Sequence, residues 1–194
     1  MALPAFATAA DLAAATQRSD LSVESADLAL ASASAVIRSW TRQSITQVID
    51  DVVTLRVLHD YELILPQRPV ASVSQVRVNG LTLLDWVLSG DRLLRTGGWR
   101  RLPGTTTYPD PGLVEVTYTH GYAEIPDEVR AVCIDLAAMT LTNPGGLRER
   151  ERVIDDWRQR DVYAMETLGS GTLSAAHMAM LSAYRRRIGT VGLR

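Results

Sequence analysis

The chain has 194 residues, of which 46% are hydrophobic, and its mean hydropathy is +0.01. This length accommodates one domain with a hydrophobic core and an insertion, and it is short for two full domains. The formal charge of −2 argues against a protein whose main task is to grip nucleic-acid phosphates.

All 20 basic residues are arginine. Codon usage in a G+C-rich genome is the first explanation, and a need for bidentate arginine contacts is the alternative. The single cysteine, Cys133, falls at a core position of a predicted helix, which argues against a disulfide framework or a cysteine metal cluster. The N-terminus has no basic region, and no apolar run reaches the roughly 18 residues that span a bilayer, so we expect a soluble, intracellular protein.

The chain opens with two predicted helices. Thr8 and Asp11 have the spacing of a capping box, which predicts a short helix over residues 9–16. Apolar residues three or four apart predict a second helix from about residue 20 or 22 to Thr41. Its many small side chains permit another helix to approach closely, from this chain or from a neighbouring subunit. These small residues are Ala29, Ala31, Ser32, Ser34 and Ala35.

Strands follow the helices, because the hydrophobic period changes to two at about residue 50. Asn79-Gly80 is the strongest hairpin signal in the chain, and turns rich in glycine and proline continue to residue 112. Residues 50–119 are therefore predicted to form a small antiparallel β unit inserted between helices.

The stretch 113–144 joins this β unit to a third helix. Alternation predicts a half-buried strand up to Thr119, and Gly121 then supplies a corner with positive φ. Pro126 fits the first position of the helix, which we expect to end at Asn143. The predicted structural corner consists of His120, Gly121, Tyr122 and Pro126.

Beyond Gly146 the chain is predicted to form an arm. Residues 147–194 hold nine arginines against six acidic residues, a net charge of +3, whereas residues 1–146 hold eleven against sixteen, a net charge of −5. A basic arm on an acidic body favours docking onto an acidic neighbour. Residues 153–165 fit a strand or a helix. A last helix is predicted from Leu173 to about Arg187, with its apolar side made of Ala176, Met180, Leu181 and Tyr184.

The predicted fold class is therefore α+β. A small helical bundle over residues 1–146 contains the β insertion at about 50–119, and an extended C-terminal arm covers residues 147–194.

The residues capable of catalysis or ligand binding show no catalytic or metal-binding pattern. His59, His120 and His177 lack the spacing of metal ligands, and we interpret each as structural. The acidic pairs Asp50-Asp51 and Asp155-Asp156 are interpreted as solvated turns, because neighbours on a strand point to opposite faces. We expect no cofactor, no bound metal and no enzymatic activity.

A glycine-rich segment at residues 97–101 is predicted to be a hairpin turn, since it lacks the lysine and the strand-to-helix context of a phosphate loop. Trp99, Arg100 and Arg101 are predicted to form a loop tip that contacts protein, and contact with nucleic acid is the alternative.

Several segments resemble the head-tail connector, or adaptor, family of long-tailed double-stranded DNA phages. The most specific is Val-Thr-Tyr-Thr-His-Gly-Tyr at residues 116–122, followed by Ile-Pro-Asp-Glu-Val-Arg at 125–130. The opening Thr-Ala-Ala-Asp-Leu at 8–12 and the closing Leu-Ser-Ala-Tyr-Arg at 181–185 are also similar to the family. The resemblance covers nearly the whole chain, and its motifs are structural.

The resemblance implies a ring of identical subunits, usually twelve, beneath the portal protein of a phage or a related gene-transfer particle. Such a ring extends the DNA channel, passes double-stranded DNA without reading its sequence, and receives the next neck or tail-completion protein. It implies a location in the virion neck, after assembly in the host cytoplasm. In the family the C-terminal segment reaches the portal, which places portal binding on Arg148, Arg150, Arg152, Trp157, Tyr184, Arg185, Arg186 and Arg187.

Two other classes remain open from the sequence. A small enzyme would need a convergent acid, base and nucleophile. A small nucleic-acid-binding accessory protein would need a basic face, which the charge of the body opposes.

Overall fold

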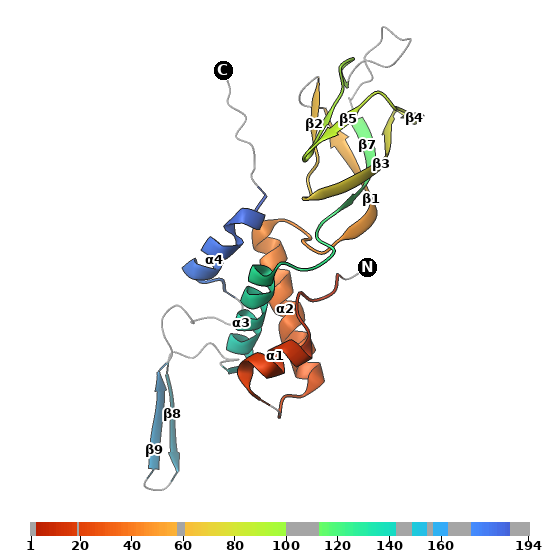
Figure 1. The fold of residues 1–194 in the computed structure, drawn as a ribbon. Coiled ribbons are helices and arrows are strands. Elements are labelled where there is room, and N and C mark those ends of the chain that lie inside the picture. Colours follow the sequence, from red (N-terminus) through yellow and green to blue (C-terminus); the bar gives the residue numbers. More distant parts are fainter. Residues whose placement is uncertain are drawn as a thin grey trace. The chain divides into compact units, whose positions relative to one another are not determined.

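The structure is a computed structural model that describes residues 3–18, 20–57, 61–99, 113–142, 149–154, 157–162 and 172–186, the two stretches within 149–162 by their backbone alone. It divides into two compact units (Figure 1). One unit comprises residues 1–42 and 125–194, and the other comprises residues 43–124. Helices dominate the first unit and antiparallel sheets form the second, so the predicted α+β class is confirmed.

Four α-helices and a 3₁₀ turn belong to the helical unit: α1 (Ala9–Thr16), α2 (Val23–Thr41), α3 (Asp127–Thr142), α4 (Ala175–Leu181) and the turn Ser182–Tyr184. The predicted capping box begins α1, since the Asp11 N–H donates to Thr8 Oγ1 at 3.2 Å and the Thr8 N–H donates to Asp11 Oδ2 at 2.9 Å. These contacts hold the pKa of the Asp11 carboxyl below its usual value, first through the Thr8 backbone and then through its hydroxyl.

The core of the helical unit forms where α1, α2 and α3 pack together. Leu30 and Ile37 of α2 and Leu136 of α3 are fully buried there. Cys133 is also buried, and burial raises the pKa of its thiol. Its Sγ lies 3.3 Å from Ser34 Oγ, which in turn accepts the Phe6 N–H at 3.0 Å, so that the N-terminal segment is tied to the core.

An antiparallel hairpin of β8 (Glu149–Ile154) and β9 (Trp157–Val162) follows α3 along the chain. Most of residues 153–165, which fitted either a strand or a helix, are therefore strand. Within the residues that the structure describes, these two strands pair only with each other.

The β unit consists of two antiparallel sheets. A four-stranded sheet has the order β1-β7-β3-β4, and a three-stranded sheet has the order β2-β6-β5. The bounds are β1 (Val48–Arg56), β2 (Glu62–Ile64), β3 (Val70–Val78), β4 (Leu81–Thr82), β5 (Val87–Ser89), β6 (Arg92–Leu94) and β7 (Leu113–His120). Asn79 and Gly80 both have positive φ, 50° and 80°, which confirms the predicted hairpin between β3 and β4.

One apolar core serves both sheets. Val76, Val116 and Tyr118 of the four-stranded sheet are fully buried, as is Leu93 of the three-stranded sheet. This placement follows from the alternation in β7, where every second side chain faces the core.

The corner after β7 brings three backbone segments together. The Gly121 N–H donates to the Pro69 carbonyl at 2.9 Å, and the Tyr122 N–H donates to the Ile45 carbonyl at 2.7 Å. Gly121 has a φ of 87°, which confirms the predicted positive value. A Cβ at this position would lie 2.4 Å from the Thr46 carbonyl oxygen, so the corner excludes a side chain on two separate grounds. Pro126 precedes α3 by one residue, and its carbonyl accepts the Arg130 N–H at 3.0 Å.

A nearly buried guanidinium lies at the end of the three-stranded sheet. Arg95 Nε lies 3.0 Å from both carboxylate oxygens of Asp85, and its Nη1 donates to the Gly98 carbonyl. The Arg95 side chain is 2% exposed. Its hydrogen bond holds the pKa of the Asp85 carboxyl below the ordinary value of 3.8.

Gly121→Ala is predicted to destabilise the β unit far more than Gly90→Ala. Both glycines have positive φ, but the space around Gly90 is open to 4 Å, whereas a Cβ on Gly121 meets backbone. We expect a loss of about 1 kcal/mol for Gly90→Ala from backbone conformation alone. The loss for Gly121→Ala should be roughly 3 kcal/mol, because a collision is added. Urea unfolding followed by tryptophan fluorescence measures both, and equal losses would show that the close contact is absent.

Asp85→Ala is predicted to lower the free energy of unfolding by about 2 kcal/mol, because the buried Arg95 guanidinium loses a carboxylate at 3.0 Å that is itself 54% exposed to water. Glu115→Ala removes the exposed ion pair with Arg77 and should cost less than about 1 kcal/mol. Since the pKa of Asp85 is lowered in the fold, its contribution is present above pH 3.8 and is lost as the pH falls through the lower folded value. Unfolding of both variants between pH 7 and pH 3 tests this, and Asp85→Ala should show the weaker acid dependence.

Candidate functional site

A histidine lies at the centre of a polar cluster in the corner of the β unit. His120 Nε2 lies 3.1 Å from Asp51 Oδ2, and its Nδ1 lies 3.4 Å from Ser44 Oγ. The ring is buried and packs on Tyr118, with 4.8 Å between the ring centroids. The contacts run from serine to histidine to aspartate, as in the catalytic triad of a hydrolase. However, the Ser44 hydroxyl also donates to the Thr46 carbonyl at 3.3 Å, so it is engaged in a backbone contact. The cluster therefore connects the loop before β1 to β1 and β7.

The structure corrects the prediction for Asp50 and Asp51. They lie in β1 at an irregularity of its pairing with β7, where Asp50 has a φ of 53°. Asp50 accepts a hydrogen bond from the Ser74 hydroxyl at 3.0 Å, and Asp51 contacts His120. They are not a solvated turn, because an extra residue in the strand gives both carboxylates partners within the β unit.

The predicted loop tip is wrong for Trp99. Its side chain is fully buried in the core of the β unit, where it is one of the largest buried side chains. A tryptophan next to two arginines suggested an exposed contact, but the large apolar surface of its indole ring favours burial. Arg100 and Arg101 lie outside the described residues.

Only part of the predicted portal-binding set is described with side chains. The Tyr184 hydroxyl donates to Glu128 Oε2 at 2.9 Å. The pKa of the Glu128 carboxyl is lowered first by its own backbone N–H and then by this bond. The Arg185 guanidinium lies 4.9 Å from the centre of the Trp40 ring, and the Arg186 N–H donates to the Thr41 carbonyl at 2.9 Å. The segment after α4 therefore contacts the ends of α2 and α3.

The other members of that set are known only in part. Arg150 and Arg152 stand in β8 opposite Asp161 and Gln159, and Trp157 stands in β9 opposite Ile154. The side chains of these residues, together with Arg148, Arg187 and His59, lie outside the described part.

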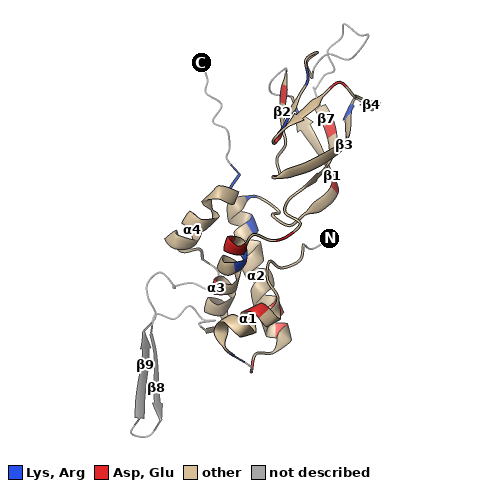
Figure 2. Cartoon of the chain, in the orientation of Figure 1, with Lys and Arg blue, Asp and Glu red and all other residues tan. Residues whose placement is uncertain are grey.

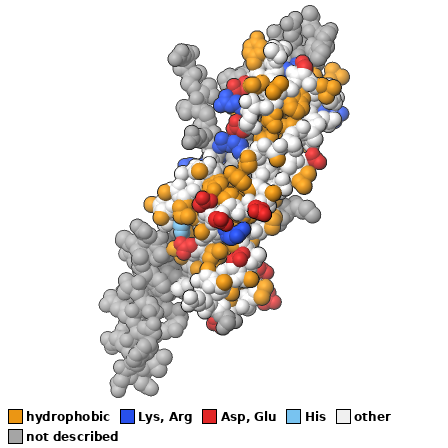
Figure 3. Space-filling view, viewed as in Figure 1, with side chains coloured by type: hydrophobic (Ala, Val, Ile, Leu, Met, Phe, Trp, Pro, Cys, Tyr) orange, Lys and Arg blue, Asp and Glu red, His pale blue; other side chains and the backbone are white. Residues whose placement is uncertain are grey.

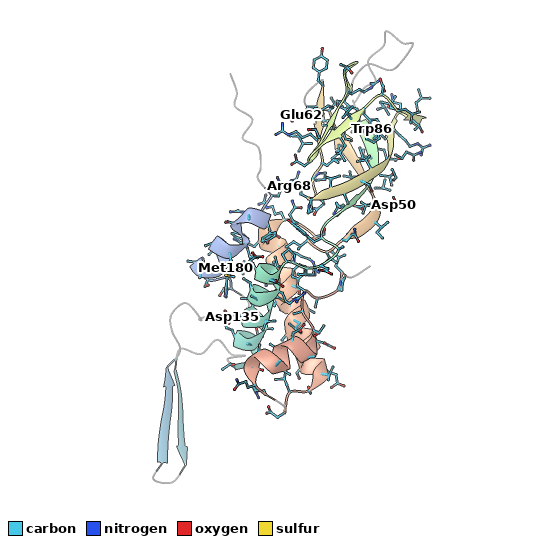
Figure 4. All side chains as sticks on the ribbon, in the orientation of Figure 1. Asp50, Glu62, Arg68, Trp86, Asp135 and Met180 are labelled. Carbon is cyan, nitrogen blue, oxygen red and sulfur yellow. The ribbon has the colours of Figure 1, made fainter. Side chains whose placement is uncertain are left out.

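The predicted apolar side of the last helix is confirmed for Leu181 and wrong for Ala176 and Met180, which are exposed. His177 and Leu181 of α4 are buried, whereas Met180 is 43% exposed. His177 Nε2 lies 2.8 Å from Asp135 Oδ2 on α3, and the His177 N–H donates to Ser174 Oγ at 3.2 Å. Figure 4 labels Asp135 on α3 and Met180 on α4. A histidine with two polar partners replaces an apolar side chain in this packing, and periodicity alone gave no signal for it.

A groove of about 790 Å³ lies along the outer side of α2. Ser32, Ala35 and Trp40 of α2 line it together with Leu173 and Met178, and Arg42 and Arg185 contribute its positive charge. The small residues of α2 therefore serve two faces. Ala29, Ala33 and Ser34 are buried inside the helical unit, whereas Ala31, Ser32 and Ala35 are exposed. The spacing of Ala26, Leu30, Ala33 and Ile37 in the sequence favoured the side of α2 that is buried, but it gave no signal for a groove on the other side.

The outer face of the three-stranded sheet mixes exposed apolar side chains with polar ones. The polar members are Glu62, Ser89 and Arg92, and Arg92 pairs with Glu62. Register places Leu94 of β6 directly opposite Val87 of β5 on this face, and Ile64 of β2 lies in the adjacent row. Their exposed fractions are 40%, 66% and 48%. Hydrophobic side chains gather on the β unit in Figure 3. Exposed apolar side chains that lie next to one another are candidates for contact with another protein.

The described residues contain no helix that is long and apolar enough to cross a membrane. The same part of the chain also contains no group of three or more His, Cys, Asp or Glu residues placed to hold a metal ion.

His177→Ala is predicted to loosen α4 locally. With only seven residues, α4 depends on tertiary contacts for its stability. Loss of the contact with Asp135 should raise the hydrogen exchange of α4 amides by about tenfold, while exchange in α2 and α3 changes little. Met178→Ala is the matched control, because that side chain is 37% exposed on the same helix. Equal exchange in the two variants would rule out His177 as the anchor.

A scan against protein-family models and a comparison with curated proteins both find no match. Solved structures do match. A chain from the neck of a native gene transfer agent particle, computed with C12 symmetry, is 22% identical with a TM-score of 0.55, and the match covers 96% of this chain and 93% of that chain.

Two further chains give similar results. One comes from the neck of an empty gene transfer agent particle, computed with C6 symmetry, at 21% identity and a TM-score of 0.59, covering 96% and 93% of the two chains. The other comes from the virion of a native gene transfer agent particle, at 21% identity and a TM-score of 0.59, covering 94% and 90%. The chain therefore shares its fold, over nearly its whole length, with chains of gene transfer agent necks and virions.

Proposed function

We propose that this chain is a structural head-to-tail adaptor of a phage or phage-like particle. In this role it forms a ring beneath the portal, extends the DNA channel and docks the next neck or tail-completion protein. The observation that carries the proposal is the fold shared with chains of gene transfer agent necks across 96% of the chain. The motifs that resemble the adaptor family support it independently, because they were read from the sequence alone.

Ring formation has support from both the comparisons and the surface of the chain. The neck structures with matching chains were computed with C12 and C6 symmetry, and twelve is the subunit number that we propose here. A ring uses heterologous contacts, in which one face of a subunit meets a different face of the next. The exposed apolar side chains on the outer face of the β2-β6-β5 sheet support such a contact, since a neighbouring subunit would remove Val87 and Ile64 from water.

Portal binding is assigned in this proposal to the C-terminal arm. The arm carries a net charge of +3 against −5 for the rest of the chain, which favours an acidic docking surface on the portal. Figure 2 shows the acidic and basic residues of the described part. The proposed ring sits in the virion neck and assembles in the host cytoplasm. Double-stranded DNA would slide through a lumen formed by the acidic body, because few phosphates would be neutralised there.

Electron microscopy of the purified chain, with and without portal protein, tests the proposal. We expect rings of about twelve subunits, or collars of that symmetry on the portal. Replacing Arg148, Arg150 and Arg152 together by Glu should abolish portal binding, because it reverses the charge of the arm, and ring formation should remain. Arg56→Glu is the matched control, since it reverses an exposed arginine of the β unit. A chain that stays monomeric and ignores portals would contradict the proposed role.

A further inference from the structure

We propose that the outer face of α2 is a self-complementary docking surface, through which two copies of the unassembled chain pair with their α2 helices antiparallel. The contact is isologous, since the same face is used on both copies. It is therefore distinct from the heterologous contacts of a ring, and the inference does not depend on the proposed function.

The surface is a continuous stripe on one side of α2. At 100° per residue, Glu24, Leu28, Ala35 and Arg42 fall within about 40° of one line along the helix. All four are exposed, and Leu28 is 74% exposed. The opposite side of α2 is occupied inside the helical unit, where Ile37 is fully buried. Among the residues that the structure describes, the stripe is therefore the side of α2 that no other element buries.

Opposite charges lie at the two ends of this stripe. Glu24 is in the first turn of α2 and Arg42 is its C-cap residue, about five turns further along at nearly the same angle. In Figure 2, acidic residues lie toward one end of this helix and basic residues toward the other. An antiparallel copy brings each Glu24 against the Arg42 of its partner, so that two ion pairs form by symmetry. Antiparallel packing also sets the two helix dipoles in opposition, which is the favourable arrangement.

The middle of the stripe allows close contact. The stripe is centred at residue 33, and Ala31 and Ala35 lie two positions on either side of it. In the antiparallel pair, Ala31 of one copy therefore faces Ala35 of the other. Small side chains at this crossing permit an interaxial distance of about 8 Å, the short end of the usual range. Ser32 and Ser39 fill the remaining exposed positions between Leu28 and Arg42. The half-buried Arg38 lies at one edge of the stripe, where its guanidinium donates to the Pro4 carbonyl and stacks over Phe6.

The groove beside α2 accommodates the exposed leucine. In the antiparallel arrangement, Leu28 of one copy lies opposite Ser39 of the other, which lines the groove together with Ala35. The groove volume of about 790 Å³ exceeds that of a leucine side chain several times. Burial of two Leu28 side chains by symmetry adds an apolar contribution to the two ion pairs.

The positive charge of the groove favours a second copy of the chain as its occupant over residues 187–194 of the same chain. Arg42 and Arg185 line the groove, and the last eight residues carry Arg187 and Arg194 with no acidic residue. Like charges disfavour that segment, whereas Glu24 of a second copy supplies the missing negative charge.

A charge swap within one chain tests the pairing. Analytical ultracentrifugation of the full-length chain over a concentration series should show a dimer that dissociates at high salt, because the ion pairs are exposed to ions at the rim. Each of the single variants Glu24→Arg and Arg42→Glu turns both intermolecular ion pairs into contacts between like charges. Each should therefore weaken the dimer about tenfold. The double variant Glu24→Arg/Arg42→Glu restores opposite charges and should recover the wild-type dissociation constant.

Two control variants separate loss of this contact from loss of folding or a general change of charge. Leu28→Ala should weaken the dimer while leaving thermal unfolding unchanged, since the side chain is exposed in the single copy. Arg56→Glu reverses an exposed charge in the β unit and should leave the dimer intact. A wild-type chain that sediments as a monomer or only as a larger ring overturns the inference. It is likewise overturned if either single reversal has no effect, or if the double variant fails to recover.

Discussion

The close approach of backbone at Gly121 is the constraint on which the β unit depends. The residue after it donates to Ile45, and Gly121 itself donates to Pro69, so that the end of β7 is joined to the segments that precede β1 and β3. β7 is also the strand that pairs with both β1 and β3. A side chain at Gly121 would separate these segments, since the Thr46 carbonyl occupies its place. His120 adds to the same junction through Asp51 and Ser44.

In the helical unit, the two faces of α2 have different surroundings. One face of the helix packs in the core through Leu30 and Ile37, and its outer face borders a groove. Small residues serve both purposes, because they let α3 pack closely on one side and leave room for a partner on the other. The proposed adaptor role would use surfaces of this kind, since contacts between copies carry that role.

Several elements were predictable because their signals are local. The Thr8 capping box and the Asn79-Gly80 turn each depend on a few neighbouring residues, and both are present as expected. The strand β7 followed from its own alternation. In contrast, Trp99 was expected at a loop tip and lies in the core, since its burial depends on strands distant in sequence. The burial of His177 on α4 was likewise missed, because its partner Asp135 lies 42 residues earlier in the chain.

The sequence by itself determined the α+β class, the order of the helices and strands, the glycine at the corner and the resemblance to adaptors of phage necks. These features follow from caps, turns and periodicity, all of which act between residues close in the chain. Tertiary structure alone decided where Trp99 and His177 are buried and which apolar side chains of the three-stranded sheet remain at the surface. The reason is physical, because burial depends on the elements that pack against a side chain, and those elements come from distant parts of the chain.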